Sequence, residues 1–420
     1  MRSVGLPGNI CHAIHRLGPG LDVPLLRQRI TTSPLIDWLT RVRITRPLGL
    51  LAPVWRADPE ARCVFRELND ADFNQFGTVS LPEALQTGEL QAARGPALAL
   101  TVINHPGKSS HLVFSWNHSL LDARGADLFL RHLIGHGTGN GTPEVENLIN
   151  PNQKSFNLPS WWRNVNTARG SVEWLNASGR EPLFSLLPPR RPASPRKNRF
   201  HVILFSEQER VSIDARCEKL NAGFRRSHFY LAATVRAVHT VAAGRGNKTG
   251  AYLIPTPHDT RRRGAKGPIF SNHLSILFHR IEPHQAGNVS EIMAELGNQM
   301  TDQIRTRFPE CCMAALDMFK PLPLPFFVHH LGKPTRGKFA TFCFSDSGEA
   351  LSGMREIMGA KIQEVTHLVP AWRPPGLTVV FLSFNGQLSA LLSAVDDCLS
   401  SEEVDLMERA LRVALLEEAL

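Results

Sequence analysis

The residues of this chain best suited to chemistry are His118 and Asp122, which stand four positions apart. An imidazole titrates near neutral pH and therefore suits a general base, and a nearby carboxylate can orient its ring. The spacing alone is not specific, because a chain with 17 histidines holds about one such pair by chance. The alternative interpretation is a histidine that ends a strand and an aspartate near the start of a helix.

The elements around the pair would hold it rigidly. Residues 111–116 alternate in polarity and predict a half-buried strand that places Leu112, Phe114 and Trp116 on one face. Residues 126–133 predict a helix that stops near Gly135. A strand at 96–103 precedes the pair and makes a hairpin with 111–116. His118 would therefore follow a strand, and Asp122 would precede a helix.

A proline-rich, basic segment at 181–199 predicts an extended crossover, because prolines are excluded from helix interiors and central strands. It divides the chain into an N-terminal subdomain, 1–180, and a C-terminal subdomain, 200–420. Leu25 to Thr40 could hold a helix. In the second half, strands are expected at 200–205, 251–255 and 272–281, a loop at 256–264, and helices at 206–220, 227–241 and 290–306. Asn385-Gly386 predicts a hairpin, and Ser400 with Glu403 caps a closing helix.

Composition indicates a globular chain of two domains, with 420 residues, 42% hydrophobic and 20% charged. The net charge of +9 favours acidic partners such as nucleic acid, anionic lipid or the phosphates of coenzyme A. No nucleic-acid-binding motif accompanies the charge, so we expect no nucleic-acid partner. No apolar run approaches the roughly 18 residues that span a bilayer, so membrane contact is at most peripheral. The apolar segment 321–327 is interpreted as a packed loop, with a membrane-facing mouth as the alternative.

Seven cysteines without a CxxC pair encode neither a disulfide framework nor an obvious zinc site. Cys343 and Cys398 stand in apolar surroundings and are expected to be buried thiols. The N-terminal residues lack the apolar stretch of a secretory signal, so we expect a reducing, cytoplasmic location. His279 and the pair His329-His330 lack ligand spacing, and no metal is expected. Signatures of common hydrolases, metalloproteases and nucleoside triphosphatases are absent.

The order of these features resembles the acyl-coenzyme A-dependent acyltransferase superfamily with the chloramphenicol acetyltransferase-like fold. That superfamily includes peptide-synthetase condensation domains and wax ester synthases. His118 and Asp122 match its HxxxD motif, and the proline-rich crossover matches the link between its two halves. The other matching features are the loop 257–263, the strand led by Asn272, the loop 344–348 and the hairpin at 384–386. The resemblance implies an α/β fold of two chloramphenicol acetyltransferase-like subdomains, each a mixed sheet flanked by helices, with an active-site tunnel between them.

Three positions depart from the commonest family pattern. Asn117 stands where condensation domains and wax ester synthases usually have a second histidine. Gly125 comes three residues after Asp122 rather than directly after it, and Asp346 replaces a usual asparagine. These departures leave the subfamily open.

The resemblance implies a role for each candidate residue. His118 would be the general base, and Asn272 would donate a hydrogen bond to the oxyanion. Asp122 would fix the loop by pairing with Arg261, or with its neighbours Arg262 or Arg263. The remaining candidates are Gly125 as a structural residue, and Asn117, Trp116 and Ser347 in substrate binding.

The implied activity is transfer of an acyl group from acyl-CoA to a hydroxyl or amine acceptor. No cofactor is expected to be permanently bound, since acyl-CoA or acyl-phosphopantetheine is a co-substrate. Two alternatives stay open. One is a condensation-like enzyme that takes its acyl group from an acyl carrier protein, and the other is a catalytically silent member that binds a thioester or a partner protein.

Overall fold

The computed structural model describes residues 9–416, except 46–53, 71, 87–89, 91, 92, 94, 95, 106, 108, 136–157, 180, 189–196, 320–325, 327, 328, 330, 331 and 334. Residues 189–196 of the expected crossover, most of the apolar segment 321–327 and His330 therefore lie outside the described residues.

The first sheet has six strands in the order β12-β13-β1-β7-β6-β4. Its centre is β7, Ser110–Asn117, which pairs antiparallel with β1, Ile10–Leu17, and with β6, Leu98–Asn104. The expected hairpin of two strands before His118 is thereby confirmed. β4, Val64–Asn69, adds a parallel edge, and β13, Ala360–Leu368, pairs with the other side of β1. The two-residue β12, Glu356–Ile357, closes the far edge.

Strand β7 is buried on both faces, not half-buried as the alternation suggested. Leu112, Phe114 and Trp116 do share one face, and they pack against helices α1 (Val23–Thr32), α2 (Pro34–Arg41) and α4 (Ala123–Ile134). On the opposite face, Val113 packs with Val380 and Leu391 of the second sheet. A central strand between two layers has no solvated side, so its polar residues face a protein interior.

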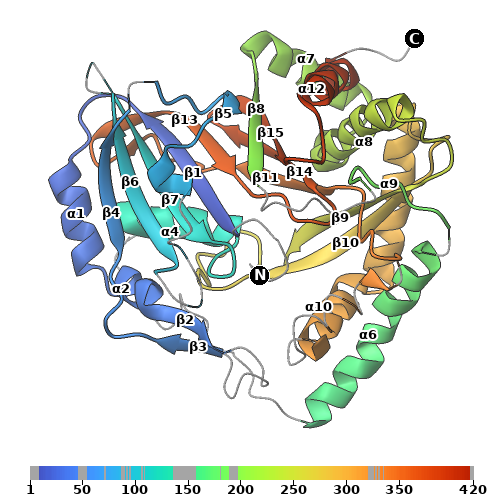
Figure 1. Cartoon of the computed structure of the whole chain (residues 1–420), viewed down its shortest axis with the longest axis horizontal. Coiled ribbons are helices and arrows are strands. Elements are labelled where there is room, and N and C mark those ends of the chain that lie inside the picture. Colours follow the sequence, from blue (N-terminus) through green and yellow to red (C-terminus); the bar gives the residue numbers. More distant parts are fainter. Residues whose placement is uncertain are drawn as a thin grey trace.

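The second sheet has the order β11-β14-β15-β8-β5. β14, Leu377–Phe384, and β15, Gln387–Val395, form the hairpin expected at Asn385-Gly386, and both turn residues have positive φ, as a type I′ turn requires. β8, Asn198–Phe205, pairs with β15, and β11, Cys343–Glu349, runs parallel to β14. Figure 1 shows the two sheets side by side with helices around them.

The two halves of the sequence exchange strands across the expected division at 181–199. β12 and β13 belong to the C-terminal half but complete the first sheet, and β5, Gly77–Val79, belongs to the N-terminal half but pairs with β8. A strand can pair with the edge of a sheet however far apart the two lie in the sequence. A proline-rich segment therefore does not show which sheet a strand will join. Each of the two sheets therefore contains strands from both halves of the sequence.

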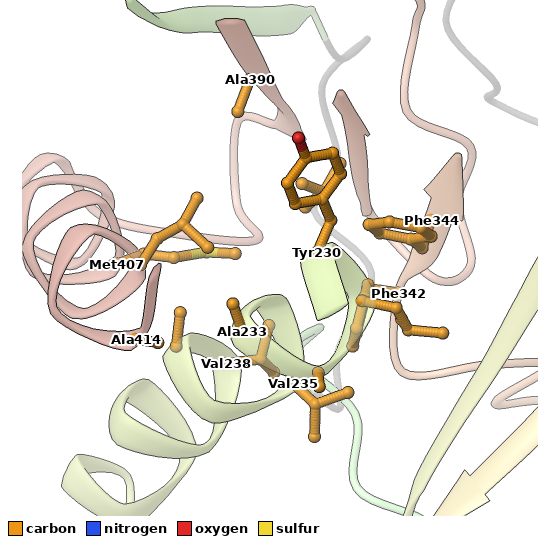
Figure 2. Packing of buried hydrophobic residues seen from close by; sticks show 14 of the residues in the cluster. Tyr230, Ala233, Val235, Val238, Phe342, Phe344, Ala390, Met407 and Ala414 are labelled. Carbon is orange, nitrogen blue, oxygen red and sulfur yellow. The ribbon is translucent and has the colours of Figure 1, made fainter. Parts of the chain in front are cut away.

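The helices of the second unit surround an apolar core built on α8, Arg226–Gly244, and α12, Ser401–Leu416. Figure 2 shows Tyr230, Val235 and Val238 of α8 with Met407 of α12 and with Phe342 and Phe344 near β11. The remaining elements are β2 (Val42–Thr45), β3 (Val54–Ala57), α3 (Glu83–Gln86), α6 (Leu158–Ser178), α7 (Glu207–Lys219), η4 (Gly223–Arg225), β9 (Tyr252–Asp259), β10 (Leu274–Ile281), α9 (Val289–Arg305) and α10 (Phe308–Phe319).

Most of the expected helix signals hold. The box of Ser206 and Glu209 caps α7, and the hydrogen bonds between Ser400 and Glu403 cap α12. The helix expected from Leu25 to Thr40 is instead broken into α1 and α2, because Ser33 caps a new helix at Pro34.

Two further expectations need correction. β9 runs on to Asp259 through a segment expected to be a loop; its prolines are tolerated because β9 pairs with β10 alone within the described residues. The four-residue spacing of Ile292, Leu296, Met300 and Ile304 predicts that they share one face of a helix. Ile292 is buried but Ile304 is exposed, because a strict four-residue repeat drifts around a helix of 3.6 residues per turn.

Cys398 is buried and Cys343 is partly exposed, and burial raises the pKa of both thiols to about 12.

Among the described residues, no helix has the length and apolar character needed to cross a membrane.

Candidate active site

The end of β7 passes into a turn whose geometry Asn117 determines. The Asn117 amide donates to the carbonyl of Ala97 at 2.7 Å, and its own carbonyl accepts from Leu120 at 2.8 Å. Its side-chain Oδ1 accepts from the Ser119 amide at 3.0 Å, and Nδ2 donates to Leu90 at 3.4 Å. Asn117 was expected to bind substrate, but its buried side chain is occupied in closing the turn that precedes Asp122.

Trp116, also a candidate for substrate binding, is buried and supports the loop from the core. Its ring is 2% exposed and stacks on Phe114 with 5.0 Å between centroids. The indole Nε1 donates to the carbonyl of Leu121 at 3.0 Å. A buried indole that satisfies its N–H in this way supports the residue just before Asp122 from the core side.

Both main-chain polar groups of His118, the amide and the carbonyl, form hydrogen bonds. Its amide donates to the carbonyl of Asn9 at 2.8 Å, and its carbonyl accepts from Nδ2 of Asn272 at 2.8 Å. The residue is partly buried, and the ring forms no hydrogen bond within the described part of the chain. The backbone is therefore fixed, while no described residue occupies the imidazole nitrogen that would accept a proton.

Asp122 is fully buried and accepts hydrogen bonds from three groups. It caps α4 by accepting from the Gly125 amide at 2.7 Å, and it accepts from the His273 amide at 2.8 Å. Arg261 places Nη2 3.0 Å from both carboxylate oxygens. Of the three neighbouring arginines considered from the sequence, Arg261 is the one that reaches Asp122, whereas Arg262 and Arg263 are exposed. The carboxylate is thus committed to structure and makes no bond to the His118 ring.

Gly125 lies where no side chain fits. A Cβ at this position would stand 2.5 Å from the carbonyl oxygen of Ile269. The close approach brings the first turn of α4 against the chain that leads to Ser271 and His273. The need for glycine here comes from contact with the second half of the sequence, not from backbone conformation, since its φ is not positive.

Two further main-chain contacts join the same segments. Leu121 and Ser271 form a parallel bridge, and the Ser271 amide donates to the carbonyl of Leu120 at 2.7 Å. The segment 117–125 and the segment 259–273 therefore form one hydrogen-bonded unit. Among the sequence candidates, this unit contains Asn117, His118, Asp122, Gly125, Arg261 and Asn272.

Asn272 is hydrogen-bonded within this unit, whereas Ser347 lies on another element. Asn272 is exposed, and it uses one N–H of its amide to bind the His118 carbonyl, which leaves the second N–H available. Ser347 lies on β11, and within the described residues no hydrogen bond links it to the unit. Its neighbour Asp346 is largely buried, and burial raises the pKa of that carboxyl above its usual value.

One polar pair beside the motif was not expected. His12 on β1 bonds through Nδ1 to Oγ of Ser115 on β7 at 2.8 Å, and burial lowers the pKa of His12 to about 4. The two residues are 103 positions apart, so no local pattern could have indicated the contact. Within the described residues, no group of three or more potential ligands could hold a metal ion.

Comparison with known proteins identifies the fold. No protein-family model matches the chain, and no curated protein matches its sequence. Among solved structures, the TRI3 trichothecene 15-O-acetyltransferase from Fusarium sporotrichioides is similar with a TM-score of 0.70 and 13% identity, over 97% of this chain and 91% of that one. The first condensation domain of the calcium-dependent antibiotic synthetase gives a TM-score of 0.68 and 12% identity, over 97% and 90% of the two chains.

The epimerization domain from the third module of tyrocidine synthetase B gives a TM-score of 0.64 and 13% identity, over 97% of this chain and 90% of that one. The chain therefore has the α/β fold of condensation domains and acetyltransferases, with two subdomains. Because an epimerization domain has the same fold, the fold does not decide the reaction, which must be argued from the site.

Proposed function

We propose that this protein is an acyltransferase that moves an acyl group from a thioester donor to a hydroxyl or amine acceptor. The observation that carries the proposal is the state of His118, whose main chain is fixed from both sides while its ring is unbonded within the described residues. A general base needs a defined position and a free nitrogen, and His118 has both.

In the proposed reaction, an imidazole nitrogen of His118 takes the proton of the acceptor as the acceptor oxygen or nitrogen attacks the thioester carbonyl. The C–S bond of the tetrahedral intermediate then breaks, and the leaving sulfur receives the proton from the imidazolium. The remaining N–H of Asn272 is our candidate for stabilising the oxyanion. Asp122 acts by holding the loop and is not a relay, because its hydrogen bonds are all directed to the backbone and to Arg261.

The donor is proposed to be acyl-CoA. The loop that carries Arg261 also presents Arg262, Arg263 and Lys266 to solvent, and within the described residues none of these three forms an ion pair. Exposed cations beside the site would attract the phosphates of such a donor. A carrier-protein-bound donor is the second candidate, supported by the similarity to condensation domains, and a silent binding protein is the third.

The test is release of free thiol from acyl-CoA donors of short to long chain, with pooled alcohol and amine acceptors. Wild type is compared with His118→Ala and with His284→Ala, which removes an exposed histidine in a turn. We expect acceptor-dependent release that His118→Ala lowers by about 10²–10⁴-fold and His284→Ala leaves intact. Release from carrier-bound donors alone would favour the second candidate. No release from either kind of donor would favour the third.

A further inference from the structure

Helix α4 carries a second buried carboxylate, Asp127, which no motif singled out. Its Oδ1 accepts from the main-chain amide of Leu351 at 2.7 Å. Its Oδ2 accepts from Nε of Arg131 at 2.9 Å and from Nη1 of Arg124 at 3.1 Å. Asp127 thus links the helix capped by Asp122 to a segment 224 residues further along the chain.

Leu351 has an unusual backbone conformation. Its φ is 45°, in the left-handed region that branched residues avoid, and its side chain is buried in the core of the first unit. The neighbouring Ala350 amide donates to Ser383 of β14 at 2.8 Å, and the Leu351 carbonyl accepts from Met354 at 2.8 Å. Such a conformation persists only where its surroundings hold it, and the bond from Asp127 is one of these restraints.

The restrained turn directly follows β11. The register of β11 against β14 shifts between Asp346 and Glu349, which marks an irregularity in the strand. Ser347 lies within this irregular stretch, and the Gly348 amide donates to Oδ1 of Asp346 at 3.0 Å. The ladder pairs Asp346 with Phe381 and next Glu349 with Ser383, so it gives Ser347 and Gly348 no partner on β14. The bond from α4 to Leu351 lies two residues beyond Glu349.

The charge of Asp127 is balanced within its own helix. Arg124 and Arg131 supply the two cations, and the Asp127 carboxylate also lies near the imidazoles of His15 and His367. Burial lowers the pKa of both histidines to about 4, so both rings are neutral at pH 7. Neither ring therefore adds a positive charge beside Asp127 at neutral pH.

We propose that Asp127 is a positioning residue for acyl transfer, one that sets the irregular end of β11, with Ser347, relative to His118. The inference rests on the proposed function. Asp122 at the start of α4 holds the segment 261–273, and Asp127 five residues later holds Leu351. One helix thus joins the segment that carries Asn272 to the turn that follows Ser347.

The experiment compares wild type with Asp127→Ala, with Asp127→Asn, whose amide oxygen can still accept from Leu351, and with Asp302→Ala, which removes an exposed ion pair on α9. Steady-state kinetics are measured well below the melting temperature, together with amide hydrogen exchange at Leu351 and His273. We expect Asp127→Ala to lower kcat on the order of 10- to 100-fold, as misplacement of about 1 Å does. Exchange should accelerate at Leu351 and stay slow at His273, while Asp127→Asn restores most of the turnover and Asp302→Ala resembles wild type.

An Asp127→Ala protein with rapid exchange at Leu351 and a kcat within about two-fold of wild type would overturn the inference while leaving the proposed function standing. If Asp127→Ala does not fold, Asp127→Ser replaces it with the same readouts. A wild type that transfers no acyl group from any donor would overturn the proposed function, and with it the role proposed for Asp127.

Discussion

Arg261 and Asp122 form an ion pair from which water is excluded, with the guanidinium 2% and the carboxylate 0% exposed. The residues are 139 positions apart and belong to the two segments that form the candidate site. Arg261 also donates through Nε to the carbonyl of Pro268 at 2.9 Å, and its Nη1 lies 3.1 Å from the partly exposed Asp259. The pair therefore fixes two loops at once, and among the described residues Asp122 bonds to the backbone and to Arg261 and not to the His118 ring.

Replacing Asp122 with asparagine should lower stability together with activity. The change leaves the Arg261 cation buried without its partner, and loss of one member of a buried pair costs about 3–5 kcal/mol. Urea unfolding monitored by circular dichroism measures the free energy, and thiol release measures transfer. The matched control is Asp259→Asn, which removes the exposed partner of the same arginine and should cost at most about 1 kcal/mol. Equal losses for the two variants would contradict the structural role assigned to Asp122.

Gly125→Ala should destabilise the protein by about 1–3 kcal/mol, because the new methyl group would meet the Ile269 carbonyl and push two backbones apart. The control is Gly244→Ala at the end of α8, where a Cβ meets nothing within 4 Å and alanine should stabilise slightly. Thermal melts of both variants provide the measurement. A Gly125→Ala protein with the same melting temperature as wild type would show that the two segments can move apart without loss of stability.

Stability should fall on acidification below pH 6.5. Burial lowers the pKa of His12, His15 and His367 to about 4, so the unfolded chain binds protons that the folded chain does not. The penalty is absent above pH 6.5, grows by up to about 1.4 kcal/mol per pH unit for each histidine, and levels off below pH 4. Urea titrations at pH 7, 6 and 5 test this. The glutamine of His12→Gln can keep a hydrogen bond to Ser115 but does not titrate, so the free energy of unfolding should depend less steeply on pH. An unchanged slope would show that His12 does not contribute to the pH dependence.

Local signals predicted much of the site. The alternation of 111–116, the helix signal after Asp122 and the Asn385-Gly386 turn act over a few residues, and each element formed where it was expected. His118 and Asp122 could therefore be placed at the two ends of one short loop. Gly125 stood out only as a departure from a motif, and its contact with Ile269 explains its position.

The parts that could not be predicted depend on contacts between distant residues. The pairing of β13 with β1 joins residues about 350 positions apart, and neither strand carries a local mark of its partner. Trp116 and Asn117 were candidates for substrate binding, and their contacts with Leu121 and Ser119 could not be predicted from the sequence. The choice among three adjacent arginines depended on which one the loop directs inward.

The exposed cations Arg262 and Arg263 should affect binding of the acyl donor and not the rate of the chemical step. If Arg262 and Arg263 attract a donor phosphate, the variant with both changed to alanine should raise KM for acyl-CoA several-fold with little change in kcat. The matched substrate is an acyl-N-acetylcysteamine thioester, which has the same reactive group without any phosphate, and its KM should not change. The effect on acyl-CoA should also shrink as salt is raised, because exposed charges are screened. A parallel loss with both donors would instead mean that the substitutions disturb Arg261 and, through it, the loop that carries His118.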